Sequence, residues 1–272
     1  MLPFGTSPNL FLGCDRLGSA LSPLSTSEAV RFVSTAHTAG ITHFDTADVY
    51  GQGDSERILS QALRLNTYTG RASAVIATKG GQYFSTKQRL LTMFKPVIRL
   101  ATNLTTIRQR VAKERGGTLP TIFSKEYMVQ AVSSSLQRLR TDYIDIFYLH
   151  CPTDEALVDD DLFDVLDGLE SAGKIRMWGV SCDTAHSVEL ALAQPRVKLI
   201  QADISHLPSP LGAGDKTLVV RRLSMTDSFR KGSIRQSFRE ALTIPNAKGI
   251  NVGTTNLEHV WRNVQAFKEV TG

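Results

Sequence analysis

The chain has 272 residues, of which 42% are hydrophobic and 21% are charged, a balance typical of one globular domain with a single large core. No stretch is apolar for long enough to span a membrane, and the first residues do not have the pattern of a signal peptide. The net charge of +5 is concentrated between residues 81 and 120, where eight basic residues against one acid give +7, so that the rest of the chain sums to −2. This uneven distribution argues against nucleic-acid binding by the protein as a whole.

Short β-rich runs alternate with helical patterns along the chain. We predict strands over residues 10–13, 41–45, 74–79, 143–150, 174–181, 197–201, 217–222 and 248–253. Between and after them we predict helices over residues 27–39, 54–65, 124–139, 160–172, 185–193, 233–242 and 257–270.

Strands that are separated by helices pair in parallel. Eight such strands in a chain of this length favour a closed (β/α)₈ TIM barrel over an open doubly wound sheet. A Rossmann fold, the alternative, is also disfavoured, because no phosphate-binding G-x-G-x-x-G motif follows an early strand. We find no linker, so we expect residues 1–272 to form one α/β domain with a basic helical insertion after the third strand.

The insertion, at about 84–120, interleaves apolar residues with arginine and lysine, which is typical of an amphipathic helix. A solvated helical face that forms a flap over the pocket is our first interpretation. A local site for an anionic partner, such as a phosphate, an acidic substrate or an acidic membrane surface, is the alternative.

The three cysteines, Cys14, Cys151 and Cys182, are widely spaced and contain no Cys-x-x-Cys pair. We therefore expect neither a disulfide framework nor a zinc site, and we expect the protein to lie in a reducing cytoplasm.

Polar residues fall at the C-terminal ends of six predicted strands. One such residue is commonly a helix cap or a loop anchor, but six around one ring indicate an active site, because the loops after the strands converge at that rim of a barrel. The six are Asp45, Lys79, His150, Ser181, Gln201 and Gly253.

The types of residue at this rim suggest proton transfer. The pKa of a free tyrosine is about 10, too high for an efficient acid near neutrality. A lysine beside Tyr50 would lower that pKa, and Asp45 would keep the Lys79 ammonium charged and oriented. His150 would orient a carbonyl oxygen or share in the proton transfer. A purely structural Asp45–Lys79 ion pair and a rim histidine are the alternatives, and Glu56 is interpreted as a charge in the first turn of its helix.

Five segments of the chain resemble the aldo-keto reductases. They are Phe44–Gly51 (FDTADVYG) with Ser55–Glu56, Ala77–Lys79 (ATK), Asp142–His150 (DYIDIFYLH), Lys174–Ser181 (KIRMWGVS) and Gly253–Asn263 (GTTNLEHVWRN). The resemblance runs from about residue 9 to 270, with a gap at 84–120 and a weak correspondence at 204–232.

The resemblance implies an NADPH-dependent reductase of a small carbonyl compound. Asp45, Tyr50, Lys79 and His150 match the family's catalytic tetrad, with Tyr50 as the proton donor. Ser181 and Gln201 would bind the nicotinamide carboxamide. The 2′-phosphate and adenine end would face the last helix, at Gly253, Thr254, His259, Arg262 and Asn263, where a helix N-terminus suits a phosphate.

Three positions depart from the family pattern. Cys182 replaces an asparagine that contacts the carboxamide, and Ile204 replaces an aromatic residue that stacks on the nicotinamide. His259 replaces a phosphate-binding arginine, for which Arg262 could compensate. These departures leave two alternatives open: an NADP-binding regulatory subunit that senses redox state, and a lyase that forms a Schiff base on Lys79.

Overall fold

The computed structural model describes residues 4–5, 7–19, 22–84, 119–209, 211–212 and 214–272. The predicted insertion at 84–120 therefore lies outside the described residues, apart from Phe84, Leu119 and Pro120 at its two ends. Among the described residues, no helix combines the length and the apolar character that a bilayer span requires.

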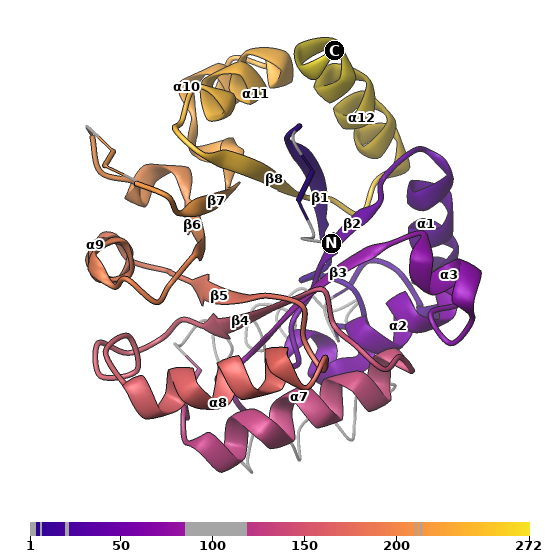
Figure 1. Ribbon diagram of the computed structural model, residues 1–272. Coiled ribbons are helices and arrows are strands. Elements are labelled where there is room, and N and C mark those ends of the chain that lie inside the picture. Colours follow the sequence, from indigo (N-terminus) through magenta and orange to yellow (C-terminus); the bar gives the residue numbers. More distant parts are fainter. Residues whose placement is uncertain (1–3, 6, 20–21, 85–118, 210, 213) are drawn as a thin grey trace, which may run out of the picture.

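Eight parallel strands form a closed barrel, in which the first strand pairs with the last (Figure 1). This confirms the predicted (β/α)₈ architecture. The strands are β1 (Asn9–Gly13), β2 (His43–Asp45), β3 (Val75–Gly80), β4 (Ile146–His150), β5 (Trp178–Ser181), β6 (Leu199–Asp203), β7 (Thr217–Arg221) and β8 (Ala247–Gly253).

Helices surround this barrel, as Figure 1 shows in a view close to the barrel axis. Most begin at a capping side chain, such as Ser124, whose hydroxyl accepts a hydrogen bond from the Tyr127 N–H. In the described part of the link from β6 to β7, the 3₁₀ turn η2 (Ile204–His206) replaces an α-helix. The helices are α1 (Thr26–Thr38), α2 (Asp54–Leu63), α3 (Tyr68–Ala72), α7 (Lys125–Leu139), α8 (Asp160–Ser171), α9 (Ala185–Ala193), α10 (Asp227–Arg230), α11 (Ile234–Leu242) and α12 (Leu257–Thr271).

Several strands begin later than the sequence predicts, and two of them begin three or four residues later. β4 begins at Ile146 instead of residue 143, and β5 begins at Trp178 instead of residue 174. The Asp145 carboxylate accepts the Ile76 backbone N–H at 2.9 Å and pairs with Arg71 at 2.5 Å. At this end of the barrel, the Asp145 carboxylate thus binds a backbone N–H of β3 that is then not available to β4. The regular hydrogen-bond ladder between β3 and β4 begins only beyond this contact.

A small apolar cluster fills the barrel interior below the site. Successive residues of a strand point to opposite faces, so every second residue points inward. The residues two positions further along four of these strands are polar. Lys79 follows Ala77, His150 follows Tyr148, Gln201 follows Leu199, and Arg221 follows Val219. The next inward layer of the barrel is therefore polar, and it forms the floor of the site. The cluster consists of Phe11, Ala77, Ile146, Tyr148, Leu199 and Val219, with Phe4 packed against it.

Candidate active site

The four residues of the expected tetrad lie together at the C-terminal end of the barrel. The Lys79 ammonium donates to Asp45 Oδ1 at 2.5 Å and to the Thr46 carbonyl oxygen at 2.8 Å. It lies 5.1 Å from the centre of the Tyr50 ring. The Tyr50 and His150 rings meet edge to face, with their centres 5.8 Å apart. Because Lys79 is fully buried and Asp45 almost so, the low-polarity surroundings strengthen this ion pair.

The turn that carries Tyr50, η1 (Tyr50–Gly53), is held against the loop after β1. Gly51 has a φ of 57°, and a Cβ at this position would lie 2.7 Å from the Gly18 carbonyl carbon and 2.9 Å from the Leu17 carbonyl oxygen. Only glycine fits this close approach of two backbones. The Asp48 N–H also donates to the Lys79 carbonyl oxygen at 3.1 Å, which ties the same turn to β3.

Glu56 lies in the first turn of α2, as expected, but it is not a surface charge. Its side chain is fully buried and forms an ion pair with Arg138 of α7. It also accepts a hydrogen bond of 2.7 Å from the Thr78 hydroxyl. The Arg138 side chain packs over Gly53, where a Cβ would collide with it. Glu56 and Arg138 therefore connect α2, α7 and β3 directly behind the Tyr50 turn.

The pKa of Tyr50 is raised well above its ordinary value, mainly by burial and further by the charges of Asp45 and Asp15. The expectation of a lowered Tyr50 pKa is wrong for the described structure, because burial and the two carboxylates outweigh the nearby positive charge. Tyr50 is consequently fully protonated near neutral pH. Burial, followed by the charges of Lys79 and Arg221, lowers the pKa of His150 well below its usual value, so its imidazole is neutral.

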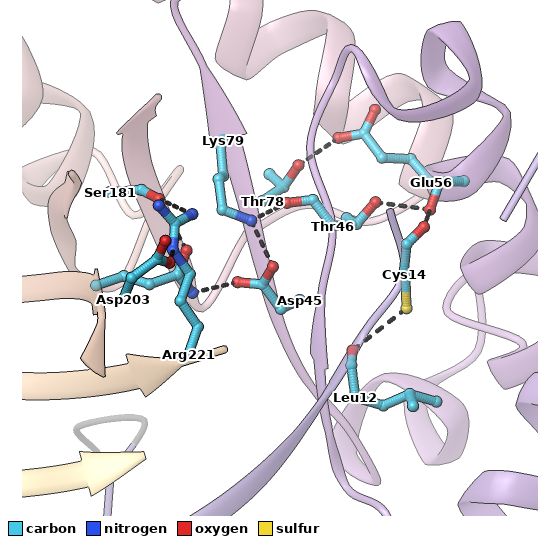
Figure 2. Close-up of polar contacts among 12 residues, drawn as sticks. Leu12, Cys14, Asp45, Thr46, Glu56, Thr78, Lys79, Ser181, Asp203 and Arg221 are labelled. Atoms are coloured by element: carbon cyan, nitrogen blue, oxygen red, sulfur yellow. Dashed lines mark hydrogen bonds and ion pairs between the residues drawn. The ribbon is translucent and has the colours of Figure 1, made fainter. Parts of the chain in front are cut away.

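A chain of polar contacts crosses the barrel mouth from β3 to β7 (Figure 2). Beyond the Lys79–Asp45 pair, Gln201 Nε2 donates to Asp45 Oδ2 at 2.6 Å, and Ser181 Oγ donates to Gln201 Oε1 at 2.8 Å. Arg221 Nη1 then donates to Ser181 Oγ at 3.3 Å. The chain ends at Asp203, which forms a 2.5 Å ion pair with Arg221 Nε.

Arg221 and Asp203 are part of this site, although neither is among the residues predicted from the sequence. The predicted sixth strand ends at Gln201, before Asp203, and Arg221 lies one residue before the end of the predicted seventh strand. The two-residue period of a strand offered a signal, since Asp203 follows Gln201 by two positions and Arg221 follows the buried Val219 by two positions.

A cavity of about 300 Å³ connects the tetrad with the start of α12. Asp45, Tyr50, Gln201 and Arg221 line one end, and all five residues assigned to the phosphate and adenine region line it as well. Ser181 and Ile204 are not among its lining residues. Cys182 is buried behind the wall, with its thiol directed to the Ser187 carbonyl oxygen at 3.4 Å. The five lining residues of the phosphate and adenine region are Gly253, Thr254, His259, Arg262 and Asn263.

The groups at the α12 end of this cavity suit an anionic ligand. Arg262 supplies a positive charge, and Thr254 and His259 supply polar atoms beside the N-terminus of a 15-residue helix. Helix N-termini bind phosphate groups through their exposed N–H groups and their dipole. The buried Asn251 Oδ1, which has no hydrogen-bond partner among the described residues, adds an acceptor in the same wall. This set of donors and acceptors fits a nucleotide that carries phosphate groups.

A second cavity, of about 220 Å³, is also lined by Tyr50. Asp15 and Tyr50 line both cavities, whereas His150 lines only the second. Phe84 and Leu119, which flank the undescribed segment, line the second cavity too. The buried His150 Nδ1 has no partner among the described residues. Tyr50 thus lies in the wall of both a polar, cationic cavity and a smaller one that is lined by a neutral imidazole.

Comparisons with known proteins identify oxidoreductases of similar sequence. The chain is 30% identical over 170 residues to the oxidoreductase YqkF of Bacillus subtilis, a match that covers 62% of this chain and 43% of that protein. The chain spans about half the length of the curated relatives it matches.

Solved structures share the fold. An aldo-keto reductase of Pseudomonas aeruginosa superposes with a TM-score of 0.72 at 22% identity, over 98% of this chain and 91% of that one. An aldo-keto reductase of Klebsiella pneumoniae in complex with NADPH has a TM-score of 0.67 at 19% identity, over 98% and 89% of the two chains. A sequence profile described as the Aldo/keto reductase family matches residues 9–211, more than half of the chain. This protein therefore belongs to the aldo/keto reductase family.

Proposed function

We propose that this protein reduces the carbonyl group of a small aldehyde or ketone with NADPH, or oxidises the corresponding alcohol with NADP⁺. The observation that carries the proposal is the position of Tyr50 in the wall shared by two cavities. One cavity has the polar groups for a phosphorylated nucleotide, and the other has room for a small molecule beside His150. A proton donor between the two can serve a reaction in which both ligands meet.

Each residue of the tetrad has a distinct part in this proposal. Tyr50 holds its proton near neutral pH and donates it to the substrate oxygen, which leaves a phenolate. The Lys79 ammonium near the ring, and the Arg221 guanidinium, favour that phenolate electrostatically. Asp45 holds Lys79 in place at 2.5 Å. The neutral His150 binds the substrate oxygen and orients it toward Tyr50.

NADPH, when bound, supplies the hydride that the substrate carbon receives. Arg262, Thr254 and the α12 N-terminus would hold its 2′-phosphate, while Gln201 would lie near the nicotinamide. The NADPH-bound relative from Klebsiella pneumoniae supports this cofactor. The separation of Cys14, Cys151 and Cys182, none of which forms a disulfide, supports the cytoplasm as the location.

Substitution of Tyr50 by phenylalanine tests the proposal. NADPH oxidation is followed with a panel of reactive aldehydes, and NADPH binding is followed by its fluorescence. We expect Tyr50→Phe to lose at least about a hundred-fold in kcat, the lower end of the range for general acid catalysis, and to bind NADPH as the wild type does. Tyr68→Phe, on a residue that is 89% exposed, is the matched control and should keep full activity.

The same assay separates the remaining functions. Turnover retained by Tyr50→Phe would contradict Tyr50 as the acid. Tight NADPH binding by the wild type without turnover of any aldehyde would favour the regulatory subunit. A Schiff-base lyase is disfavoured by Lys79, which is fully buried, paired with Asp45 and absent from the lining of both cavities. Arg262→Ala should weaken NADPH binding while leaving NADH binding unchanged, because only NADPH carries the 2′-phosphate.

A further inference from the structure

We propose that Arg221 positions the nicotinamide carboxamide, as the donor that the cavity wall presents beside Gln201. This inference rests on the proposed NADPH-dependent function. It assigns to β7 a contact that the sequence resemblance places on Ser181 and on the residue after it.

Arg221 is held in one orientation from three sides. Its Nε forms a 2.5 Å ion pair with Asp203, which is 2% exposed. Its Nη2 donates to the Cys182 carbonyl oxygen at 2.6 Å, and its Nη1 donates to Ser181 Oγ at 3.3 Å. A buried carboxylate and two β5 acceptors thus fix the plane of the guanidinium, and Figure 2 shows Asp203 and Ser181 beside it.

Of the residues that were expected to hold the carboxamide, only Gln201 lines the cavity. Ser181 is fully buried, does not line the cavity, and donates its hydroxyl proton to Gln201 Oε1. The Cys182 thiol points to Ser187, and its carbonyl oxygen is bonded to Arg221. Gln201 and Arg221 both line the cavity, next to Tyr50. A carboxamide that enters beside Tyr50 therefore meets these two side chains first.

Arg221 has donors to spare for this contact. A guanidinium carries five N–H groups. The hydrogen bonds to Ser181 and to the Cys182 carbonyl engage one N–H on Nη1 and one on Nη2, so one N–H on each of these two nitrogens remains after these contacts. A carboxamide oxygen accepts two hydrogen bonds, and a bond from a charged donor is stronger than one from a neutral amide.

Binding of two ligands tests this inference without any turnover. NADPH carries the nicotinamide, whereas 2′-phospho-ADP-ribose has the same adenine, phosphates and riboses but lacks the nicotinamide ring and its carboxamide. Dissociation constants are measured by calorimetry for the wild type, Arg221→Met and Arg221→Lys. Arg235→Met, on an exposed residue of α11 that pairs with Glu269, is the matched control.

We expect Arg221→Met to weaken NADPH binding about ten- to one hundred-fold, as for the loss of a hydrogen bond from a charged group, and to leave 2′-phospho-ADP-ribose within two-fold of the wild type. Arg221→Lys keeps the charge but loses the planar fork, so it should also bind NADPH more weakly. The control should bind both ligands as the wild type does.

Three results would overturn the inference. An equal loss for both ligands would make Arg221 a structural residue, unchanged binding would make it irrelevant to the cofactor, and tighter NADPH binding would make it an obstruction. If Arg221→Met does not fold, the same comparison on Arg221→Lys decides. A wild-type protein that binds neither ligand would contradict the proposed function itself, which separates the two failures.

Discussion

The buried Glu56–Arg138 pair offers a sharp test of what holds the Tyr50 turn. Glu56→Gln keeps the shape of the side chain and an acceptor for the Thr78 hydroxyl, but it removes the negative charge. Arg138 then keeps its charge without a partner on a side chain that is only 19% exposed. Breaking a buried ion pair from one side costs about 3–5 kcal/mol, and the partial exposure of Arg138 favours the lower end of this range.

We therefore expect Glu56→Gln to lower the free energy of unfolding by about 3 kcal/mol, which corresponds to roughly 6–12 °C in Tm for a protein of this size. Urea unfolding followed by circular dichroism measures the loss. Asp161→Asn, which removes a 2.7 Å ion pair between exposed groups, should cost less than about 1 kcal/mol. A loss for Glu56→Gln no larger than that of this control would refute the reasoning. The double variant Glu56→Gln/Arg138→Met should lose less than the sum of the two single losses.

Three other predictions concern pH, backbone and charge. Burial, followed by the charge of Glu56, raises the pKa of Asp48 to about 8, so the folded state binds this proton more tightly than the unfolded chain, whose pKa is about 3.9. This contribution to stability is complete below about pH 4 and is lost as the pH rises through about 8. Urea unfolding at pH 5, 6.5 and 8 should therefore show that the stability of Asp48→Asn increases relative to the wild type as the pH rises. A stability difference that stays constant over these pH values would contradict this prediction. Gly51→Ala should reduce kcat/KM more than ten-fold by displacing Tyr50, whereas Gly173→Ala, which has a φ of 69° and nothing within 4 Å, should affect stability alone. Lys79→Met should raise the pKa of His150, because the lysine charge helps to lower it; NMR titration of the imidazole checks this, and an unchanged midpoint would count against the coupling.

The ring of polar strand ends could be predicted from the sequence. In a parallel barrel all carboxyl ends of the strands meet at one mouth, so the location of a residue in the chain specifies its place in the site. β4 ends at His150 and β5 ends at Ser181, as predicted, and Lys79 is the penultimate residue of β3.

The starts of the strands were harder to predict, because β-branched and aromatic runs extend past the ladder. Tyr143 has the composition of a strand residue, but its ring lies between the Arg71 and Arg176 guanidinium groups, 3.8 and 3.9 Å from its centre. Such a cluster of side chains depends on residues far apart in the sequence, and a local pattern does not reveal it.

The direction of the side chains was the other part that the sequence did not specify. Ser181 has the right type and the right strand end for a cofactor contact, yet it faces Gln201 and Arg221 instead of the cavity. Both outcomes satisfy the same strand period, and the choice between them depends on Asp203, which anchors Arg221 from β6.

The polar contacts across the barrel mouth have a consequence for how ligands bind. Gln201 and Ser181 already bind each other and Asp45, so a polar group that meets these two side chains largely exchanges one hydrogen bond for another. The enthalpy gained there is small, and mismatched groups are penalised because they break a bond without replacing it. The affinity for the ligand would then come mainly from the α12 end and from Arg221, and selectivity between ligands from Gln201 and Ser181. Chemical analogues altered at only one end should separate the two quantities.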